Sequence, residues 1–499
     1  MRAQILTEPV PSPYYSIFQN SISNMGAFGD TLWIGPMMNY RVGDDPKWYV
    51  PENADSVVTG RGRLYSIALA PDTIVAGLGY SDVRAGESVA TQMGIYISTD
   101  GGNSWSLSDT SRTLDHPSDT TIFYGDQHLG TIPVIVPQQS PPYKVDFRGD
   151  VIFFAGWASG IRRSTDFGAS WERIVLPPLG MSELLPENNN QFFIDPRGDG
   201  QTNQHLNYMG FSVMIASDGT VYAGTAGGLN ISDNALYEEA DQIRWRNINS
   251  ISSQQGLLGN WVTSIRENPF DNAIWTTNWI SVSEYDQEGL AVTRDRGATF
   301  EHHLKGERIY EITFDGEAIF AAGLNGVFIS DNNGRSWRHI RQIQSNNTFM
   351  RPNTEYYSAA KAGNRVWIAS SDGLASTTDH GRTWKITRVD FPLDGKNQHT
   401  EEGPEVDAFA YPNPFSPRVH SLVRIKFEVS SASDVTIRLF DFSMNFIRQL
   451  DQVQALEPGV YEAVWDGTDQ QGRKLANGTV FYEIVAGGKQ TVGKILLLE

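Results

Sequence analysis

The octapeptide Ser98-Thr99-Asp100-Gly101-Gly102-Asn103-Ser104-Trp105 follows an apolar run and recurs, slightly varied, along the first four-fifths of the chain. Each copy has a hydroxyl residue, an Asp or Asn, a Gly, a second hydroxyl residue and an aromatic residue in the same order. Further near-complete copies begin at residues 164, 293, 330 and 377, and a degenerate copy lies within residues 231–245. Several near-complete copies in one chain indicate a repeat architecture.

The chemistry of this octapeptide predicts a tight turn. The Asp side chain can accept hydrogen bonds from nearby backbone N–H groups, and the Gly supplies the positive φ that a hairpin needs. The hydroxyl residue bonds back across the turn, while the aromatic residue packs on the neighbouring sheet. We therefore assign structural roles to Asp100, Trp105, Asp166, Trp171, Asp295, Phe300, Asn332, Trp337, Asp379 and Trp384.

Two further strand-like runs precede the octapeptide copies, as residues 309–314 and 318–322 precede the run 326–330. With the strand after the aromatic residue, these runs give four strands per unit at a spacing of about 40–65 residues. Residues 31–34 form a strand without a copy and fit a further unit. The sequence thus predicts an all-β fold, with a β-propeller of about seven blades in residues 1–395.

The octapeptide resembles the Asp-box, or bacterial neuraminidase, repeat of sialidases, sortilin-type receptors, xyloglucan-degrading glycosidases and photosystem II assembly factors. The resemblance implies that each copy marks the hairpin between the third and fourth strands of a blade. It also implies that the aspartates are structural, and are neither catalytic groups nor calcium ligands. We expect no cofactor and no bound metal.

Long insertions interrupt the repeat only between second and third strands and between successive blades, which by alternation lie on one face. Long loops on one side of a rigid scaffold are where binding usually resides. Aromatic and polar side chains in these insertions suit sugar or peptide contacts, and the candidate binding residues are Tyr80, Tyr124, His128, Phe193, Trp279 and Tyr285. The alternative is that the insertions only cover the channel mouth or pack on one another.

The C-terminal part of the chain predicts a second domain. Residues 396–408 are polar and indicate a linker, and the alternating runs in residues 409–499 predict an immunoglobulin-like β-sandwich. The entry Tyr411-Pro412-Asn413-Pro414-Phe415 and the last strand resemble two related modules. These are the immunoglobulin-like domain of the flagellar hook-cap protein and the C-terminal sorting domain of type IX secretion. The resemblance implies export or anchoring at the cell surface through contact with the export machinery or surface assembly partners.

Composition excludes several classes of function. A formal charge of −19 disfavours nucleic acid and anionic lipid as partners, and no run is apolar enough to span a membrane. The first residues lack the apolar stretch of a signal peptide, which fits either a cytosolic protein or a numbering that begins after the signal. With the sorting-domain resemblance, we expect a secreted or cell-surface protein.

Three hypotheses about function follow. The first is a binding protein without enzymatic activity, which presents the insertion loops to a protein or glycan partner. The second is a polysaccharide hydrolase that uses two carboxylates among Asp126, Glu183, Glu187, Asp195, Asp199 and Glu284. The third is a structural subunit of an extracellular assembly. A sialidase is disfavoured, because the expected Arg-Ile-Pro-like motif near the N-terminus is missing and Arg61-Gly62-Arg63 lacks the Pro.

Overall fold

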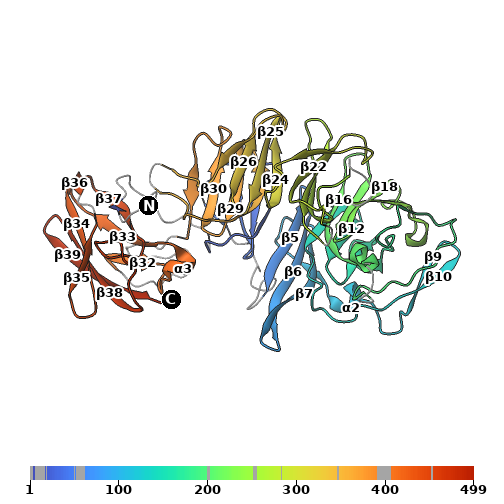
Figure 1. Cartoon of the computed structure of the whole chain (residues 1–499), viewed down its shortest axis with the longest axis horizontal. Helices are drawn as coiled ribbons and strands as arrows, with labels where there is room; N and C mark the ends of the chain where they lie inside the picture. The colour runs from blue at the N-terminus through green and yellow to red at the C-terminus, as the bar shows by residue number, and fades with distance from the viewer. Residues whose placement is uncertain are drawn as a thin grey trace.

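The computed structural model describes residues 4–5, 17, 19–45, 47–49, 51, 62–198, 203–250, 256–281, 284–345, 348–389, 406–450 and 453–498. Two bodies are visible in Figure 1, a ring of small sheets and a separate β-sandwich that contains the C-terminal strands. The prediction of an all-β fold with a propeller and an immunoglobulin-like domain is confirmed.

Within the described residues, seven antiparallel sheets form the ring. Their first strands are β2 (Asn24–Phe28), β5 (Arg63–Leu69), β11 (Lys144–Arg148), β16 (Gly210–Ile215), β20 (Trp261–Glu267), β24 (Ile309–Asp315) and β28 (Tyr356–Ala362). The second strands are β3 (Thr31–Gly35), β6 (Ile74–Arg84), β12 (Val151–Gly156), β17 (Val221–Thr225), β21 (Ile274–Trp279), β25 (Ala318–Gly323) and β29 (Arg365–Ser370). The third strands are β4 (Asn39–Val42), β7 (Glu87–Ser98), β13 (Gly160–Ser164), β18 (Gly228–Ser232), β22 (Gly289–Thr293), β26 (Gly326–Ser330) and β30 (Gly373–Thr377). The fourth strands are β8 (Ser106–Ser108), β14 (Glu172–Arg173), β19 (Trp245–Ile248), β23 (Glu301–His303), β27 (Arg338–Ile340) and β31 (Lys385–Thr387).

The ring is closed, because each first strand contacts the next one and β28 contacts β2. Most second and third strands are buried along their length, as in the apolar strands β25 and β26, since both faces of each sheet pack on a neighbouring sheet. The hydrophobic core therefore consists of separate clusters between consecutive sheets.

Polar side chains near the start of the first strands also join neighbouring sheets. Asn24 Nδ2 donates to the Leu64 carbonyl oxygen at 2.6 Å, and Ser212 Oγ donates to the Val262 carbonyl oxygen at 2.9 Å. Ser66 Oγ likewise donates to the carbonyl oxygen of Pro142, which lies just before β11. These bonds satisfy buried polar groups and fix the offset between sheets.

Each octapeptide forms the predicted kind of turn between a third and a fourth strand. Asp100 Oδ1 accepts hydrogen bonds from Ser98 Oγ at 2.8 Å and from Ser104 N at 2.9 Å, while Oδ2 accepts from Ser104 Oγ at 2.6 Å. The corresponding bonds of the other four copies are made by Asp166, Asp295, Asn332 and Asp379. In the degenerate copy the acceptor is Asn234, one residue after the Asp233 position considered from the sequence.

The glycine of each turn packs on the preceding sheet. Gly297 has φ +84°, and a Cβ there would lie 2.4 Å from Cδ1 of Ile248. The aromatic residue of the turn can also contact the preceding sheet. Trp171 Nε1 donates a hydrogen bond to Ser108 Oγ of that sheet at 2.7 Å. The turns therefore bind consecutive sheets together on one face, which we call the octapeptide face.

The opposite face, called here the insertion face, carries the long connections. They contain α2 (Thr110–Thr113), β9 (Thr121–Tyr124), β10 (Gln127–Gly130), β15 (Glu183–Leu184) and η2 (Gln204–Tyr208), whereas η3 (Ala240–Gln242) lies in the degenerate octapeptide copy. One expected loop differs from the prediction: residues 80–93 continue the paired strands β6 and β7, and the chain turns only at Ala85 and Gly86. Extended backbone pairing satisfies the hydrogen bonds that a loop of this length would leave to water.

The sandwich packs two sheets around one apolar core. One sheet contains β1 (Gln4–Ile5), β37 (Gly459–Trp465), β33 (Val423–Val429) and β32 (Ala408–Tyr411). The other contains β35 (Phe446–Gln449), β34 (Ser433–Phe440), β38 (Gly478–Ala486) and β39 (Lys489–Leu497), with β36 (Val453–Leu456) paired to β34. Helix α3 (Pro417–His420) precedes β33. Strand β1 pairs with β37, so these N-terminal residues join the sandwich rather than the propeller to which residues 1–395 were assigned.

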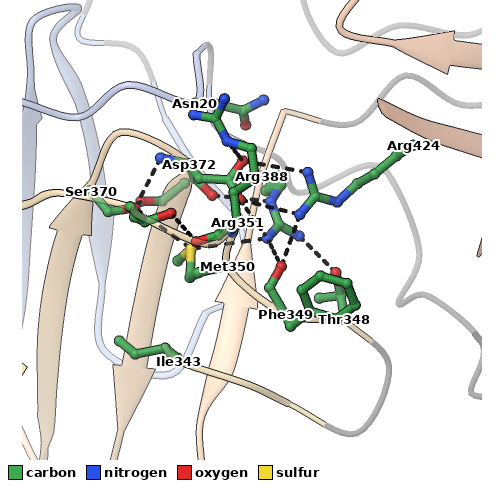
Figure 2. Close-up of polar contacts among 12 residues, drawn as sticks. Asn20, Ile343, Thr348, Phe349, Met350, Arg351, Ser370, Asp372, Arg388 and Arg424 are labelled. Carbon is green, nitrogen blue, oxygen red and sulfur yellow. Dashed lines mark hydrogen bonds and ion pairs between the residues drawn. The ribbon is translucent and has the colours of Figure 1, made fainter. Parts of the chain in front are cut away.

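A buried polar cluster docks the sandwich on the insertion face of the last sheet (Figure 2). Asp372, in the turn between β29 and β30, lies 3.2 Å from Arg388 Nη2 and 3.2 Å from Arg424 Nη2 of the sandwich. Burial opposes ionisation of Asp372, but Arg388, Arg424 and Arg351 lower its pKa to about 2. Arg424 also donates to the carbonyl oxygen of Phe349 at 2.8 Å. The sandwich is thus held in one orientation by an ionised carboxylate shared among arginines.

Candidate functional site

The first strands of five sheets carry a β-bulge at the same position near the insertion face. The bulged residues are Tyr65, Phe211, Thr263, Tyr310 and Tyr357. A bulge redirects a side chain out of the regular alternation, and such features recur next to functional sites. Four of these five redirected side chains are aromatic, and all four are half-buried.

These side chains join others into a continuous row that we call the aromatic belt. Ring centroids lie 6.1 Å apart for Tyr65 and Tyr143, 6.4 Å for Tyr143 and Phe211, and 5.2 Å for Phe211 and Trp261. Trp261 is the cross-strand partner of Trp279. The row then continues from Trp279 to Tyr310 at 5.5 Å and from Tyr310 to Tyr357 at 5.7 Å. The belt therefore crosses six of the seven sheets at their insertion-face ends.

A second tryptophan widens the belt at its centre. Trp157, in the turn between β12 and β13, lies 5.1 Å from Phe211 and 5.5 Å from Trp261 between ring centroids. All three rings are half-buried, so each keeps part of its surface open to solvent. Half-open aromatic rings packed edge to face form a rigid apolar platform that needs little ordering on binding.

Charged groups border the belt at one end. Glu355 Oε2 lies 3.1 Å from Tyr310 Oη, and the Arg308 guanidinium lies 5.1 Å from the Trp279 ring centroid. Glu288 Oε1 accepts from Arg308 Nε at 2.7 Å. A carboxylate and a guanidinium beside aromatic faces supply the few convergent polar groups that orient a ligand on an apolar surface.

The phenol groups of the belt are neutral at ordinary pH. Burial raises the pKa of Tyr143 to about 12 and also raises the pKa of Tyr65. Burial, followed by the Glu355 carboxylate, raises the pKa values of Tyr310 and Tyr357. Each hydroxyl therefore keeps its proton; Tyr310 donates a hydrogen bond to Glu355, and the hydroxyl groups of Tyr65 and Tyr143 can donate to a ligand.

One of the six candidate residues from the sequence belongs to this belt, namely Trp279. Tyr80 is half-buried on the extended β6–β7 hairpin, and Tyr285 is 75% exposed in the connection between β21 and β22. Tyr65, Tyr310 and Tyr357 were missed because they lie in strands and not in insertions, and Tyr143 lies directly before β11 at the end of an insertion. Their signal was an aromatic residue at or just before the start of first strands, as in Leu64-Tyr65-Ser66 and Ile309-Tyr310-Glu311.

The other three candidates lie around the β9–β10 hairpin. His128 is exposed and its ring centroid lies 5.3 Å from that of Phe123, while Phe193 is 56% exposed and covers Gly130. Tyr124 is completely buried, and its hydroxyl donates to the carbonyl oxygens of Leu184 and Ile243. It stabilises the core and offers no surface for a ligand.

The carboxylates considered for hydrolysis differ in their surroundings in the described structure. Glu187 Oε1 pairs with Arg244 at 2.6 Å and Asp195 Oδ1 with Arg197 at 3.1 Å, and both carboxyl groups have lowered pKa values because of these hydrogen bonds. Asp126, Glu183 and Glu284 are exposed, and Asp199 lies outside the described residues. Within the described ranges, no three His, Asp or Glu side chains are grouped as metal ligands.

The propeller channel holds a different charged cluster. Glu311 Oε2 lies 2.8 Å from Lys144 Nζ and 2.7 Å from Arg266 Nη2, beside a cavity of about 410 Å³. Burial opposes ionisation of Glu311, but these two cations lower its pKa. The cluster places one carboxylate between two cations and ties β11, β20 and β24 together across the channel.

Comparison with known proteins supports the two-part description. Residues 420–491 match the family model described as the FlgD Ig-like domain. No curated protein matches the chain by sequence. In the part of the chain that the structure describes, none of the helices is long and apolar enough to cross a bilayer.

Several solved structures resemble the chain at low identity. PorZ, described as an essential surface component of the type-IX secretion system of Porphyromonas gingivalis, is 11% identical with a TM-score of 0.42, and the match covers 96% of this chain and 66% of PorZ. A GH74 enzyme of Niastella koreensis is 11% identical with a TM-score of 0.49, covering 100% of this chain and 75% of the enzyme. YCF48 of Cyanidioschyzon merolae is 15% identical with a TM-score of 0.41, covering 74% of this chain and 97% of YCF48. This chain thus spans slightly less than two thirds of PorZ.

Proposed function

We propose that this protein is a secreted or cell-surface binding protein whose aromatic belt holds an extended glycan. The observation that carries the proposal is the row of half-buried rings from Tyr65 to Tyr357, which crosses consecutive sheets at the insertion face. The flat apolar faces of sugar rings stack on aromatic side chains, and their hydroxyl groups bond to phenols, carboxylates and guanidinium groups at the edge of the platform.

The shape of the belt favours a chain of several units over a compact ligand. The ring contacts within the row span 5.1–6.4 Å between centroids, and Trp261 and Trp279 are joined as cross-strand partners, so the row offers successive stacking positions on neighbouring sheets. Because the rings are fixed in a closed ring of sheets, binding costs little conformational entropy in the protein. We propose that the seven sheets are the blades of one propeller, which supplies this rigidity.

The C-terminal sandwich fits the second part of the proposal. Residues 420–491 match the FlgD Ig-like domain family, and the sandwich is docked on the insertion face. We propose that it exports or anchors the propeller, and that its docking fixes how the belt is presented. Under this proposal the chain binds its glycan without cleaving it.

A glycan array with the full chain, followed by calorimetry on the best oligosaccharide, tests the binding proposal. Trp261→Ala should weaken binding about tenfold or more, because a central stacking position is lost. Tyr285→Ala is the matched control, since this exposed aromatic residue lies on the insertion face outside the belt. An equal loss of affinity for the oligosaccharide in both variants, or binding to a peptide library and to no glycan, would contradict the proposal.

Product analysis distinguishes binding from hydrolysis. The full chain is incubated with xyloglucan, sialosides and the oligosaccharide found on the array, and released sugars are measured over a day. We expect none, because Glu187 and Asp195, the two candidate carboxylates paired with arginines, have lowered pKa values, whereas a general acid needs a raised one. Steady release of sugar would make the protein a glycoside hydrolase.

A further inference from the structure

Two buried arginines face each other on the outer flank of the sheet β11–β14. Arg162 of β13 and Arg173 of β14 are direct cross-strand partners, and they are only 2% and 9% exposed. Like charges at directly opposed positions repel, and burial removes the water that would screen them. Such a pair needs negative charge nearby.

The protein supplies one carboxylate for the two guanidinium groups. Asp115 Oδ1 lies 2.5 Å from Arg162 Nη1, and Asp115 Oδ2 lies 3.4 Å from Arg173 Nη1. The Oδ2 atom also accepts a hydrogen bond from Val134 N at 2.7 Å, so both carboxylate oxygens are in use. Burial opposes ionisation of Asp115, but the two arginines hold its pKa below the usual range. One positive charge is left over.

Each arginine also has a donor group left over. Arg162 Nε donates to the Ser159 carbonyl oxygen at 3.0 Å, and Arg173 Nη1 donates to Thr131 Oγ1 at 3.0 Å. Within the described residues, the buried Nη2 atoms of both side chains have no hydrogen-bond partner. A buried cationic donor without an acceptor is costly, and such groups are rare in folded proteins. Burial and the neighbouring Arg162 lower the pKa of Arg173 to about 10, which reflects the same excess of positive charge.

Both arginines line a cavity of about 400 Å³ beneath the β9–β10 hairpin. Phe123 and Trp171 give the cavity apolar walls, and Thr131 adds a hydroxyl group. The volume suits a small molecule with one anionic group at the arginine end and an apolar or sugar-like body. The cavity lies on the flank of the ring, and none of its lining residues belongs to the aromatic belt.

We propose that Arg162 and Arg173 bind the carboxylate of a small ligand in this cavity. A carboxylate has two oxygens at the spacing that a pair of guanidinium donors can reach, and it would neutralise the remaining positive charge. This site is separate from the belt and does not depend on the belt binding a glycan.

Carboxylates in the lining limit the class of ligand. Asp119, Glu172, Glu239 and Asp241 line the cavity together with the two arginines. A polyanion would be repelled by these carboxylates, whereas a molecule with a single carboxylate adds only the one negative charge that the arginines can pair. The carboxylate can come from a sugar acid or from the C-terminus of a short peptide, and these two sources share the same chemistry at the arginines.

Calorimetry with the unmodified full chain tests the proposal through matched ligand pairs. Glucuronate is compared with its methyl ester, and glycyl-phenylalanine is compared with its amide. We expect saturable binding of at least one free acid, with binding about tenfold or more weaker for the neutral partner. Binding of glucuronate alone identifies a sugar acid as the source, and binding of the dipeptide alone identifies a peptide terminus.

Substitutions assign the binding to these arginines. Arg173→Lys keeps the charge but loses the fork of donors, so it should weaken binding of the free acid about tenfold. Arg148→Gln is the control, because Arg148 belongs to the same sheet and its Nη2 already donates to the Ala216 carbonyl oxygen at 2.7 Å. If Arg173→Lys does not fold, the comparison of each free acid with its ester or amide on the unmodified protein still tests whether the cavity binds a carboxylate.

Three results would overturn the proposal. In the first, neither acid shows saturable binding with a dissociation constant below about 10 mM. In the second, an acid and its neutral partner bind equally well. In the third, Arg173→Lys binds the free acid with unchanged affinity. The first result would mean that water alone occupies the cavity.

Discussion

The two faces of the propeller are built from the same strands but differ in what their connections do. On the octapeptide face, five turns repeat one set of hydrogen bonds, and each turn glycine packs on the preceding sheet. On the insertion face, the connections differ in length and content; this face carries the aromatic belt and the sandwich docking cluster, whereas the arginine cavity lies on the flank of the ring. Repetition identifies the scaffold, and departures from the repeat identify the candidate binding surfaces.

The largest expected effect concerns the docking cluster on the insertion face. Asp372→Asn leaves Arg351, Arg388 and Arg424 without their shared charge, and removing one partner of a buried ion pair costs about 3–5 kcal/mol. We expect the free energy of unfolding of the full chain to fall by about this amount in urea titrations. Limited proteolysis should then cut the chain between propeller and sandwich faster than in the native protein.

The matched control lies on the octapeptide face. Asp331 pairs with Arg338 at 3.2 Å but is partly exposed, so Asp331→Asn should cost less than about 1 kcal/mol. The pH dependence sharpens the contrast. The pKa of Asp372 is lowered to about 2, so its contribution is fully present above about pH 4 and is lost as the pH falls toward 2. Equal effects of the two substitutions would show that Asp372 is not a special docking group.

The next effect breaks a scaffold turn. Gly297→Ala places a Cβ 2.4 Å from Ile248 Cδ1 at φ +84°, and we expect a loss of about 1–3 kcal/mol in the free energy of unfolding. Gly316→Ala shares a positive φ of +62° but meets no atom within 4 Å, so it isolates the cost of the backbone angle, about 1 kcal/mol. Thermal unfolding of both variants measures the difference. A Gly297→Ala protein as stable as Gly316→Ala would refute close packing between these sheets.

The smallest expected effect concerns the octapeptide position that is Asp in four near-complete copies and Asn332 in the fifth. Hydrogen bonds from Ser104 and Ser98 lower the pKa of Asp100 to about 2, while Asn332 occupies the same position without charge. The Asp100 contribution is present above about pH 4 and is lost toward pH 2. Asn332→Asp should therefore raise the melting temperature slightly at pH 7 and leave it unchanged at pH 2, as measured by calorimetry. A rise at both pH values would exclude ionisation as its cause.

Sequence patterns predicted the scaffold better than the site. The octapeptide is local, so its turn chemistry and the alternation of the flanking strands could be read from neighbouring residues such as Asp100 and Ser104. The belt depends on positions brought together by ring closure, and Tyr65 and Tyr357 occupy equivalent positions because five of the sheets repeat one bulge. Insertion length directed attention to exposed loops, where Tyr124 instead proved to be core. The cross-strand pairing of Arg162 and Arg173 follows from β13–β14 register, which the sequence did not define.

Calorimetric titration of the best oligosaccharide into two aromatic variants tests the division between the faces most directly. Tyr310→Ala removes a belt ring from the insertion face, while Trp337→Phe alters an octapeptide ring that packs 6.4 Å from Trp275. We predict that Tyr310→Ala weakens binding about tenfold with little change in melting temperature, and that Trp337→Phe lowers the melting temperature without changing affinity. The reverse pattern, with affinity lost on the octapeptide face and kept on the belt, would contradict the account.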